Sequence, residues 1–464
     1  MARAIQDFNF FYTILRPLVN FSTKCHYHRI EIRGKQNLPK EGGYIMAPCH
    51  QQALMEPLAV LATADKPPVF LARADIFAKP TVRAILTFLR ILPVYRIRDG
   101  KESLSKNAEI FLKSRNVILD GYPLCLMAEG RHNNRHQLLP LVKGMFRIAG
   151  ETQKQLGDTP LYIVPCGIDF DEYELPYSNL CVNIGKPIPV QPFMPTFVEN
   201  EPVALNQMRA ALTPALQGQM FDIRSQACYD EFYTLCNILN KPQRKALNLR
   251  NNPWNRFTTR QSLAHKLDAI EAQGGEKLQS IVAQAQSYTK QCAALKLQPT
   301  LTAEHWSFSL FLFSILAMAG IVAACVLSKP ILMAALFYIL CYPIAYLPTH
   351  LIPRKIIKDS QFRSSINFGI RFGFSIIYTL VFSIVMLCTR GGMWGSMLPQ
   401  LCGFCWFLIA LVVPFFAAHI NRNLVYWFRK HNANGRYWTR ALFQGKKVRA
   451  LTALRSKLYA EVSQ

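Results

Sequence analysis

The sequence is short of acidic residues, and it lacks the patterns that would place it among nucleic-acid-binding or nucleotide-binding proteins. It has 464 residues, with 53 Lys and Arg against 28 Asp and Glu, and a formal net charge of +25. Such a balance indicates a polyanionic partner, either nucleic acid or an anionic membrane surface. No zinc-type cysteine pattern, aromatic RNA-binding signature or Gly-Lys phosphate loop is present. The apolar segments of the C-terminal third, described below, make the membrane surface the predicted partner, and we expect no nucleic acid.

A disulfide framework and a cleavable signal peptide are also lacking. The 13 cysteines are scattered, and several stand inside apolar runs, as buried free thiols do: Cys125, Cys325, Cys341 and Cys402. The aromatic run at residues 8–12 is followed by Arg16 and by no small-residue cleavage site. We expect the part of the chain outside the membrane to be cytosolic.

Long apolar runs are absent from the first 300 residues and are confined to the C-terminal third. About 20 apolar residues cross a bilayer core as a helix. Four segments meet this pattern: 306–327, 331–352, 372–388 and 394–418. Basic residues gather in the second link and in the tail after His419, whereas the first and third links have one each. Basic links stay on the cytoplasmic side, so we predict four crossings of a bacterial inner membrane. The alternative is a buried helical core.

The N-terminal segment, residues 1–26, has apolar residues at roughly helical spacing around Phe8, Phe11 and Leu15, with Pro17 inside. It is too short and interrupted to span a bilayer. An amphipathic helix at the membrane interface fits the pattern. A helix packed on its own domain fits it equally well.

The stretch from Tyr44 to Pro57 combines a buried strand with an acid–base pair. An apolar run ends at Pro48, and then His50 is followed six residues later by Glu56. A histidine takes a proton near neutral pH, and a nearby carboxylate can fix its tautomer. These residues could activate a hydroxyl group. The alternative is a loop histidine beside a solvated glutamate.

Further strands and helices alternate along the chain, which predicts an α/β domain. Residues 69–72 form a strand and residues 81–92 a helix, and residues 93–98 form a short strand that includes Arg96. Another apolar run ends at Glu129–Gly130–Arg131, and the strand at 161–168 includes Pro165. Residues 260–293 follow a helical pattern that Gly274–Gly275 divides into a hairpin.

These motifs, in this order, resemble those of the glycerolipid acyltransferases, the 1-acylglycerol-3-phosphate acyltransferase family. The family's first motif is a histidine, four residues and an aspartate, and here Glu56 stands one residue later. Cys49 replaces the usual asparagine before the histidine, and Ala128 replaces the usual proline at the start of the third motif. The resemblance extends over roughly residues 27–220. It implies a mixed sheet flanked by helices, and the rest of the chain is then an all-α transmembrane extension.

The resemblance also implies roles for the motif residues. His50, oriented by Glu56, would deprotonate the acceptor hydroxyl, and Arg96 would hold the acceptor's phosphate. Glu129 would bond an acceptor hydroxyl or orient an arginine, beside Gly130 and Arg131, while Pro165 belongs to the motif on the acyl-donor side. The donor would be acyl-CoA or acyl-carrier protein. The acceptor would be a lysolipid, lysophosphatidic acid first and a lyso-aminolipid second, in phospholipid biosynthesis.

No cofactor is expected, and no metal, because His132 and His136 have no clear third ligand. The changes at positions 49 and 56 leave open a rival prediction, a lipid-binding membrane protein on a degenerate acyltransferase domain. The predicted organisation is an interface segment at 1–26, the acyltransferase domain at 27–220 and a helical extension at 221–303. Four transmembrane helices follow at 304–420, and a basic cytoplasmic tail at 421–464.

Overall fold

The computed structural model describes residues 4–95, 101–133, 135–172, 177–341 and 362–463. The chain divides into two compact units. One, the α/β unit, contains Met1–Lys24, Arg29–Glu174 and Asn179–Arg224. The other, the helical unit, contains Cys25–His28, Leu175–Ser178 and Ser225–Gln464. Each is described separately below.

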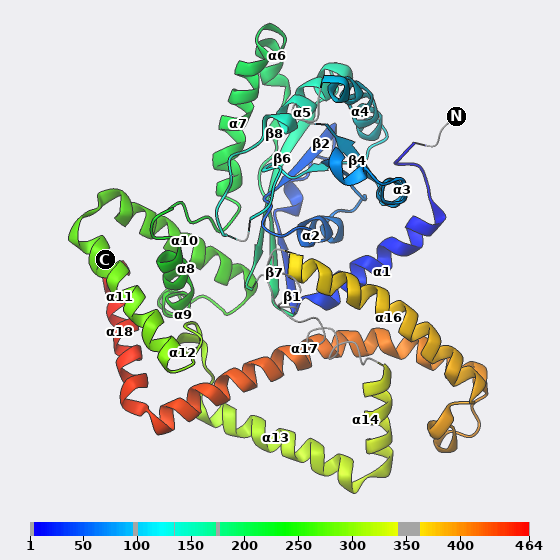
Figure 1. The fold of residues 1–464 in the computed structure, drawn as a ribbon, viewed down its shortest axis with the longest axis vertical. Helices are drawn as coiled ribbons and strands as arrows, with labels where there is room; N and C mark the ends of the chain where they lie inside the picture. Colours follow the sequence, from blue (N-terminus) through cyan, green and yellow to red (C-terminus); the bar gives the residue numbers. More distant parts are fainter. Residues whose placement is uncertain (1–3, 96–100, 134, 173–176, 342–361, 464) are drawn as a thin grey trace. The chain divides into compact units, whose positions relative to one another are not determined.

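The α/β unit is built on one mixed sheet of eight strands in the order β1-β7-β6-β2-β5-β3-β4, with β8 beside β6 (Figure 1). The strands are β1 Arg29–Arg33, β2 Gly43–Pro48, β3 Val69–Arg73, β4 Ile91–Val94, β5 Leu124–Leu126, β6 Leu161–Phe170, β7 Asn179–Ile184 and β8 Ile188–Pro189. From β6 to β4 the neighbours are parallel, while β7 and β8 run antiparallel to β6. The predicted α/β class is confirmed.

The central strands are apolar on both faces because helices cover the sheet. In β2, Ile45, Met46 and Ala47 are fully buried. The helices of this unit are α1 Phe10–His26 (its last two residues lie in the helical unit), α2 Met55–Thr63, α3 Pro80–Phe88, α4 Lys101–Leu119, α5 Lys143–Leu156, α6 Met194–Glu199 and α7 Glu201–Gln217. Because β2, β5 and β3 are parallel neighbours, the loops after them emerge at one edge of the sheet, where ligands of α/β proteins bind.

The predicted helix over 81–92 is wrong at its end, since α3 stops at Phe88. Arg90 adopts a left-handed φ of 62°. Ile91 and Leu92 then pair with Phe70 and Leu71 in the sheet. Sheet pairing decided this boundary, because an apolar pair suits a helix face and a buried strand equally well.

The N-terminal helix α1 has one packed side and one exposed side. Tyr12 is buried, and the Arg90 guanidinium lies over its ring at 4.6 Å. By contrast Phe8, Phe10 and Phe11 are 60–72% exposed. One side of this segment packs on the α/β unit, and the other presents aromatic rings that suit a membrane interface.

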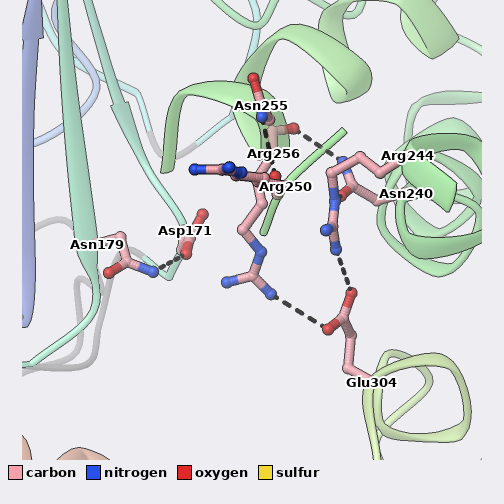
Figure 2. Close-up of polar contacts among 8 residues, drawn as sticks. All are labelled: Asp171, Asn179, Asn240, Arg244, Arg250, Asn255, Arg256 and Glu304. Carbon is pink, nitrogen blue, oxygen red and sulfur yellow. Dashed lines mark hydrogen bonds and ion pairs between the residues drawn. The ribbon is translucent and has the colours of Figure 1, made fainter. Parts of the chain in front are cut away.

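The helical unit opens with a bundle of short and long helices. They are α8 Tyr229–Ile238, α9 Asn240–Ala246, α10 Pro253–Gln273, α11 Gly275–Ala294 and α12 Leu301–Glu304. The predicted division at Gly274 is confirmed, since this glycine has φ 66° and separates α10 from α11. Figure 2 shows Glu304 between two arginines: its Oε1 lies 3.0 Å from Arg244 Nη2 and its Oε2 3.7 Å from Arg256 Nη2. This ion-pair network fixes the end of α12 where the apolar region begins.

The C-terminal tail is a helix of this same bundle. Helix α18, Gly445–Ser463, packs along α11. Gln284 Nε2 donates to both carboxylate oxygens of Glu461, at 3.0 and 2.8 Å. The Tyr459 hydroxyl donates to Gln243 Oε1 at 3.1 Å, and Arg455 bonds the carbonyl of Thr302. The basic tail is therefore ordered by contacts with residues far back in the chain.

Among the residues that the structure describes, three helices are long and apolar enough to cross a membrane: α13 Phe308–Leu327, α16 Arg363–Cys388 and α17 Gly403–Phe443. Helix α14, Lys329–Cys341, is apolar but shorter, and the rest of the predicted second segment lies outside the described residues. The predicted start of the fourth segment at residue 394 is wrong, because a 3-10 turn occupies Gly392–Met397 and α17 begins at Gly403. On α13 the side chains of Phe313, Leu316 and Val326 are 68–78% exposed. These helices indicate membrane association.

The start of α13 and the end of α17 lie together within the helical unit. The Trp306 N–H bonds Asn434 Oδ1, and Trp438 Nε1 donates to the carbonyl of Trp306 at 3.2 Å. The His305 ring stacks on Tyr437 with centroids 4.0 Å apart. The chain thus enters and leaves the apolar region at one place.

Candidate active site

The site begins where β2 ends, at the loop that leads into α2. The Cys49 N–H donates to the Cys166 carbonyl at 3.1 Å, and the Ile168 N–H donates to Cys49 Sγ at 3.1 Å. Cys49 is fully buried, and burial raises the pKa of its thiol well above the ordinary value. The thiol therefore stays protonated and is no nucleophile. Its role is to anchor the loop to β6.

His50 and Glu56 are brought together as the sequence predicted. His50 Nδ1 lies 3.4 Å from Glu56 Oε2, with 12% of the His50 side chain exposed and none of the Glu56 side chain. Glu56 lies in the first turn of α2, and its Oε1 accepts the N–H groups of Gln51 at 3.0 Å and Gln52 at 2.6 Å. A carboxylate at a helix N-terminus is favoured by the helix dipole. Glu56 thus holds the loop with one oxygen and faces the imidazole with the other.

Glu129 connects the loop after β5 to the loop after β2. Its Oε1 accepts the His50 N–H at 2.6 Å, and its Oε2 accepts the Leu139 N–H at 2.9 Å. The side chain is 1% exposed, and burial raises its pKa to about 8, although the two N–H groups act in the opposite direction. Both oxygens are thus engaged with the backbone. The geometry makes Glu129 a support for the His50 loop.

Gly130 has a packing reason to be glycine. Its φ is 62°, and a Cβ at this position would lie 2.9 Å from Val142 Cγ1. The Val142 N–H also donates to the Ala128 carbonyl at 2.9 Å, which closes the turn. A larger residue would be strained and would push the two segments apart.

The loop after Gly130 surrounds the histidine with basic and aromatic groups. The ring of His132 meets the His50 ring edge-to-face, with centroids 5.2 Å apart and an interplanar angle of 73°. The Asn133 N–H faces the His50 carbonyl at 3.4 Å, and Arg131 and Arg135 are exposed on this loop. In the sequence, only the position of His132 just after the Glu129 motif indicated that it lies near His50. That position places it beside His50 because β2 and β5 are adjacent in the sheet.

The other predicted residues lie elsewhere. Pro165 is buried inside β6, in register with Ala47, and its carbonyl accepts the Gly185 N–H at 2.9 Å. Arg96 lies outside the described residues. His136 does not join the site: it is buried, with its Nδ1 3.7 Å from Asp169 Oδ1. Within the described ranges no group of three or more His, Cys, Asp or Glu could hold a metal ion.

Such an arrangement can act as a general base. A carboxylate beside Nδ1 favours the tautomer with a proton on Nδ1, which leaves the Nε2 lone pair to accept a proton. The same carboxylate stabilises the imidazolium that results. The exposed arginines of the neighbouring loop give the rim a positive potential, which suits an anionic substrate.

Part of the α/β unit matches a known family. Residues 29–169 match the family model described as Acyltransferase. The α/β unit therefore contains an acyltransferase-family domain, as the sequence resemblance predicted.

Among solved structures, the chain is similar to the 1-acyl-sn-glycerophosphate (LPA) acyltransferase PlsC from Thermotoga maritima. The sequence identity is 16%, over 44% of this chain and 78% of that chain, with a TM-score of 0.32. The comparison with curated proteins finds no match.

Proposed function

We propose that this protein is a membrane-bound O-acyltransferase that moves a fatty acyl group from an acyl thioester to a lysolipid hydroxyl. The main support is the contact of His50 with Glu56 inside a domain that matches the acyltransferase family. The apolar helices give a second support, because a lysolipid acceptor resides in a membrane.

In the proposed reaction Glu56 keeps the Nδ1 proton of His50 in place, and His50 Nε2 removes the proton of the acceptor hydroxyl. The hydroxyl oxygen then attacks the thioester carbonyl carbon, and an ester C–O bond forms. The C–S bond breaks, and the leaving thiolate takes the proton from the imidazolium. No acyl-enzyme is required, because the acceptor is itself the nucleophile.

The remaining roles follow from position and charge. Glu129 is a positioning residue, since it holds the His50 N–H. Arg96 and Arg131 bind the acceptor's phosphate, because a guanidinium can donate two hydrogen bonds to phosphate oxygens. Gly130 shapes this loop, and Pro165 sets the strand on the acyl-donor side.

Arg96→Ala should raise the KM for a phosphate-bearing acceptor far more than for the donor. An unchanged KM would indicate a zwitterionic aminolipid acceptor.

The finer assignments belong to the same proposal. The donor is acyl-CoA or acyl-carrier protein, and lysophosphatidic acid is the first acceptor to test. The acyltransferase domain spans residues 27–220, and 221–303 joins it to the membrane region. The catalytic loop faces the cytoplasm from a bacterial inner membrane, the compartment in which the thioester donors are made.

The decisive test is acyl transfer by the purified full chain with both donors and a panel of lysolipids. His50→Ala should reduce the rate about a hundredfold or more without changing the amount in the membrane fraction. His265→Ala, an exposed histidine on α10, is the matched control and should leave the rate unchanged. Lysolipid binding without transfer from any donor would refute the proposal in favour of a lipid-binding protein.

A further inference from the structure

Two cysteines stand at the beginning of α17. Cys402 is the N-cap of this helix, and Cys405 lies three residues later, in its first turn. Their sulfur atoms are 3.4 Å apart and share a hydrogen bond. Cys402 is exposed and Cys405 half-buried. The prediction that Cys402 is a buried thiol, like Cys125, is therefore wrong, because α17 begins later than its apolar sequence indicated.

The two sulfur atoms are close together, but the Cβ atoms must also move closer before a disulfide can form. Residues three apart in a helix have Cβ atoms about 5–6 Å apart, and disulfide Cβ atoms lie about 3.5–4.5 Å apart. The two sulfur atoms must approach by about 1.4 Å to reach a bond of about 2.05 Å. A side-chain rotation at the exposed N-cap, with adjustment of the first turn, can provide this approach. The backbone of Cys402 is extended, at φ −72° and ψ 164°, and is not held by the helix ladder.

The position also favours thiol chemistry. A helix N-terminus stabilises a thiolate, and two cysteines separated by two residues are the arrangement of dithiol exchange sites. The exposed Cys402 can be reached by a partner sulfur. Cys405, behind it in the first turn, can resolve the mixed disulfide that forms.

The charge pattern indicates the side of the membrane on which this pair lies. The loop from Thr389 to Cys402 has one basic residue, Arg390. The far ends of the two helices that flank this loop are basic, with Arg363 at the start of α16 and Arg440 in the last turn of α17. Basic ends remain cytoplasmic, so the pair lies on the other face, where disulfides form and persist.

A buried aromatic cluster supports the loop beside the pair. Trp394 in the loop and Trp406 in α17 belong to one apolar cluster, and Trp394 Nε1 donates to the Met333 carbonyl at 2.8 Å. Tryptophans are enriched where apolar helices meet the membrane surface. The pair is thus held at a fixed place near the surface, where a water-borne partner can reach it.

We propose that Cys402 and Cys405 are a redox-active dithiol–disulfide pair on the membrane face opposite the proposed cytoplasmic one. The oxidant is a disulfide, of a protein or of a small molecule. The Cys402 thiolate attacks one sulfur of that disulfide, forms a mixed disulfide and releases one thiolate. The Cys405 thiolate then attacks Cys402 Sγ, forms the internal disulfide and releases the second thiolate. Two protons leave the pair, which loses two electrons as the oxidant gains two.

The test uses the full chain in intact cells and glutathione as the probe. The peptide of residues 391–422, which trypsin releases, contains these two cysteines and no other. Cells are exposed to oxidised glutathione, quenched in acid and alkylated under denaturing conditions, and the mass of this peptide is measured. The expected product is unalkylated and lighter by two hydrogens than the dithiol. Dithiothreitol should restore the doubly alkylated form.

Variants separate the two steps. In Cys405→Ser the Cys402 sulfur should retain glutathione as a mixed disulfide. Cys388→Ser, which removes an exposed cysteine at the end of α16, is the matched control and should close the pair like the wild type. A wild-type peptide that stays doubly alkylated, or that gathers glutathione without closing, would overturn the proposal. The wild-type measurement needs no variant to fold, and its failure leaves the acyltransferase proposal untouched.

Discussion

The exchange of one oxygen for an amide nitrogen at Glu56 tests the catalytic pair directly. In the structure Oε1 accepts two backbone N–H groups, and Oε2 faces His50 Nδ1 at 3.4 Å. In Glu56→Gln the amide oxygen can keep the two backbone bonds, so the loop should stay folded. The amide NH₂ then faces Nδ1 and forces that nitrogen to accept a hydrogen bond. The proton moves to Nε2, which can no longer act as the base.

The size of the effect follows from this change of tautomer. A positioned general base contributes about 10²–10⁴-fold to a rate, and a carboxylate-to-amide change in a serine protease triad costs about 10⁴-fold in kcat. We expect kcat to fall by about 10²–10⁴, which equals about 3–5 kcal/mol of activation free energy. The lower end is favoured if water reaches the imidazole, whose side chain is 12% exposed.

The assay compares initial rates of the wild type with those of Glu56→Gln, Glu56→Asp and Glu109→Gln, each in the membrane fraction. The aspartate is shorter by one methylene and cannot keep both the backbone bonds and the histidine contact, so its rate should fall below that of the wild type. It keeps the negative charge that stabilises the imidazolium, so it should lose less than the glutamine variant. Glu109, which pairs with Lys113 on the surface of α4, is the matched control and should change nothing. Equal kcat values for all four proteins would show that Glu56 does not orient His50.

Two other predictions concern stability and topology. Burial raises the pKa of Glu129 from 4.5 to about 8. Between these pH values Glu129 keeps its proton in the folded state and loses it in the unfolded chain. The contribution of Glu129 to stability is thus present below about pH 4.5 and is lost as the pH rises through 8. Glu129→Gln should reduce this pH dependence of Tm, and an identical pH dependence would contradict the shift. Because α13 begins beside the end of α17, the apolar region should cross the membrane an even number of times. Cysteine probes at Ser328 and Ser396, but not at Ser456, should then react with an impermeant reagent outside intact cells, as peptide masses would show. Labelling at Ser456 would contradict the proposed orientation.

The local sequence was sufficient to predict those elements that depend only on residues close together in the chain. The apolar run before His50 became β2, and the division at Gly274 became the boundary of α10 and α11. The contact of His50 with Glu56 could be predicted from their spacing. Only six residues separate them along the chain, and the turn from β2 into α2 keeps the two side chains near each other. Composition also located the apolar region, because it decides whether a helix prefers lipid, but it placed the start of α17 too early.

Only the tertiary structure could show what supports the histidine. Glu129 is 79 residues from His50 in the chain, yet it accepts the His50 N–H. Their contact depends on β5 lying beside β2, with the two carboxyl ends at one edge of the sheet. Periodicity gives the face a residue occupies on its own strand, but it does not give the order of strands. The sequence therefore predicted that Glu129 contacts a ligand or an arginine, whereas in the structure both of its carboxylate oxygens accept backbone N–H groups.

The same limit explains Cys402 and the C-terminal tail. Composition placed Cys402 among buried thiols, but the loop from Thr389 turns through Gly391 in a left-handed conformation, at φ 89°, and delays the start of α17. Basic composition described residues 421–464 as a tail, but the contact of Glu461 with Gln284 orders their last helix within the bundle. Local patterns determined which segments are apolar, helical or extended. Contacts between residues distant in the chain decided their neighbours, because packing free energy depends on surfaces that meet only after folding.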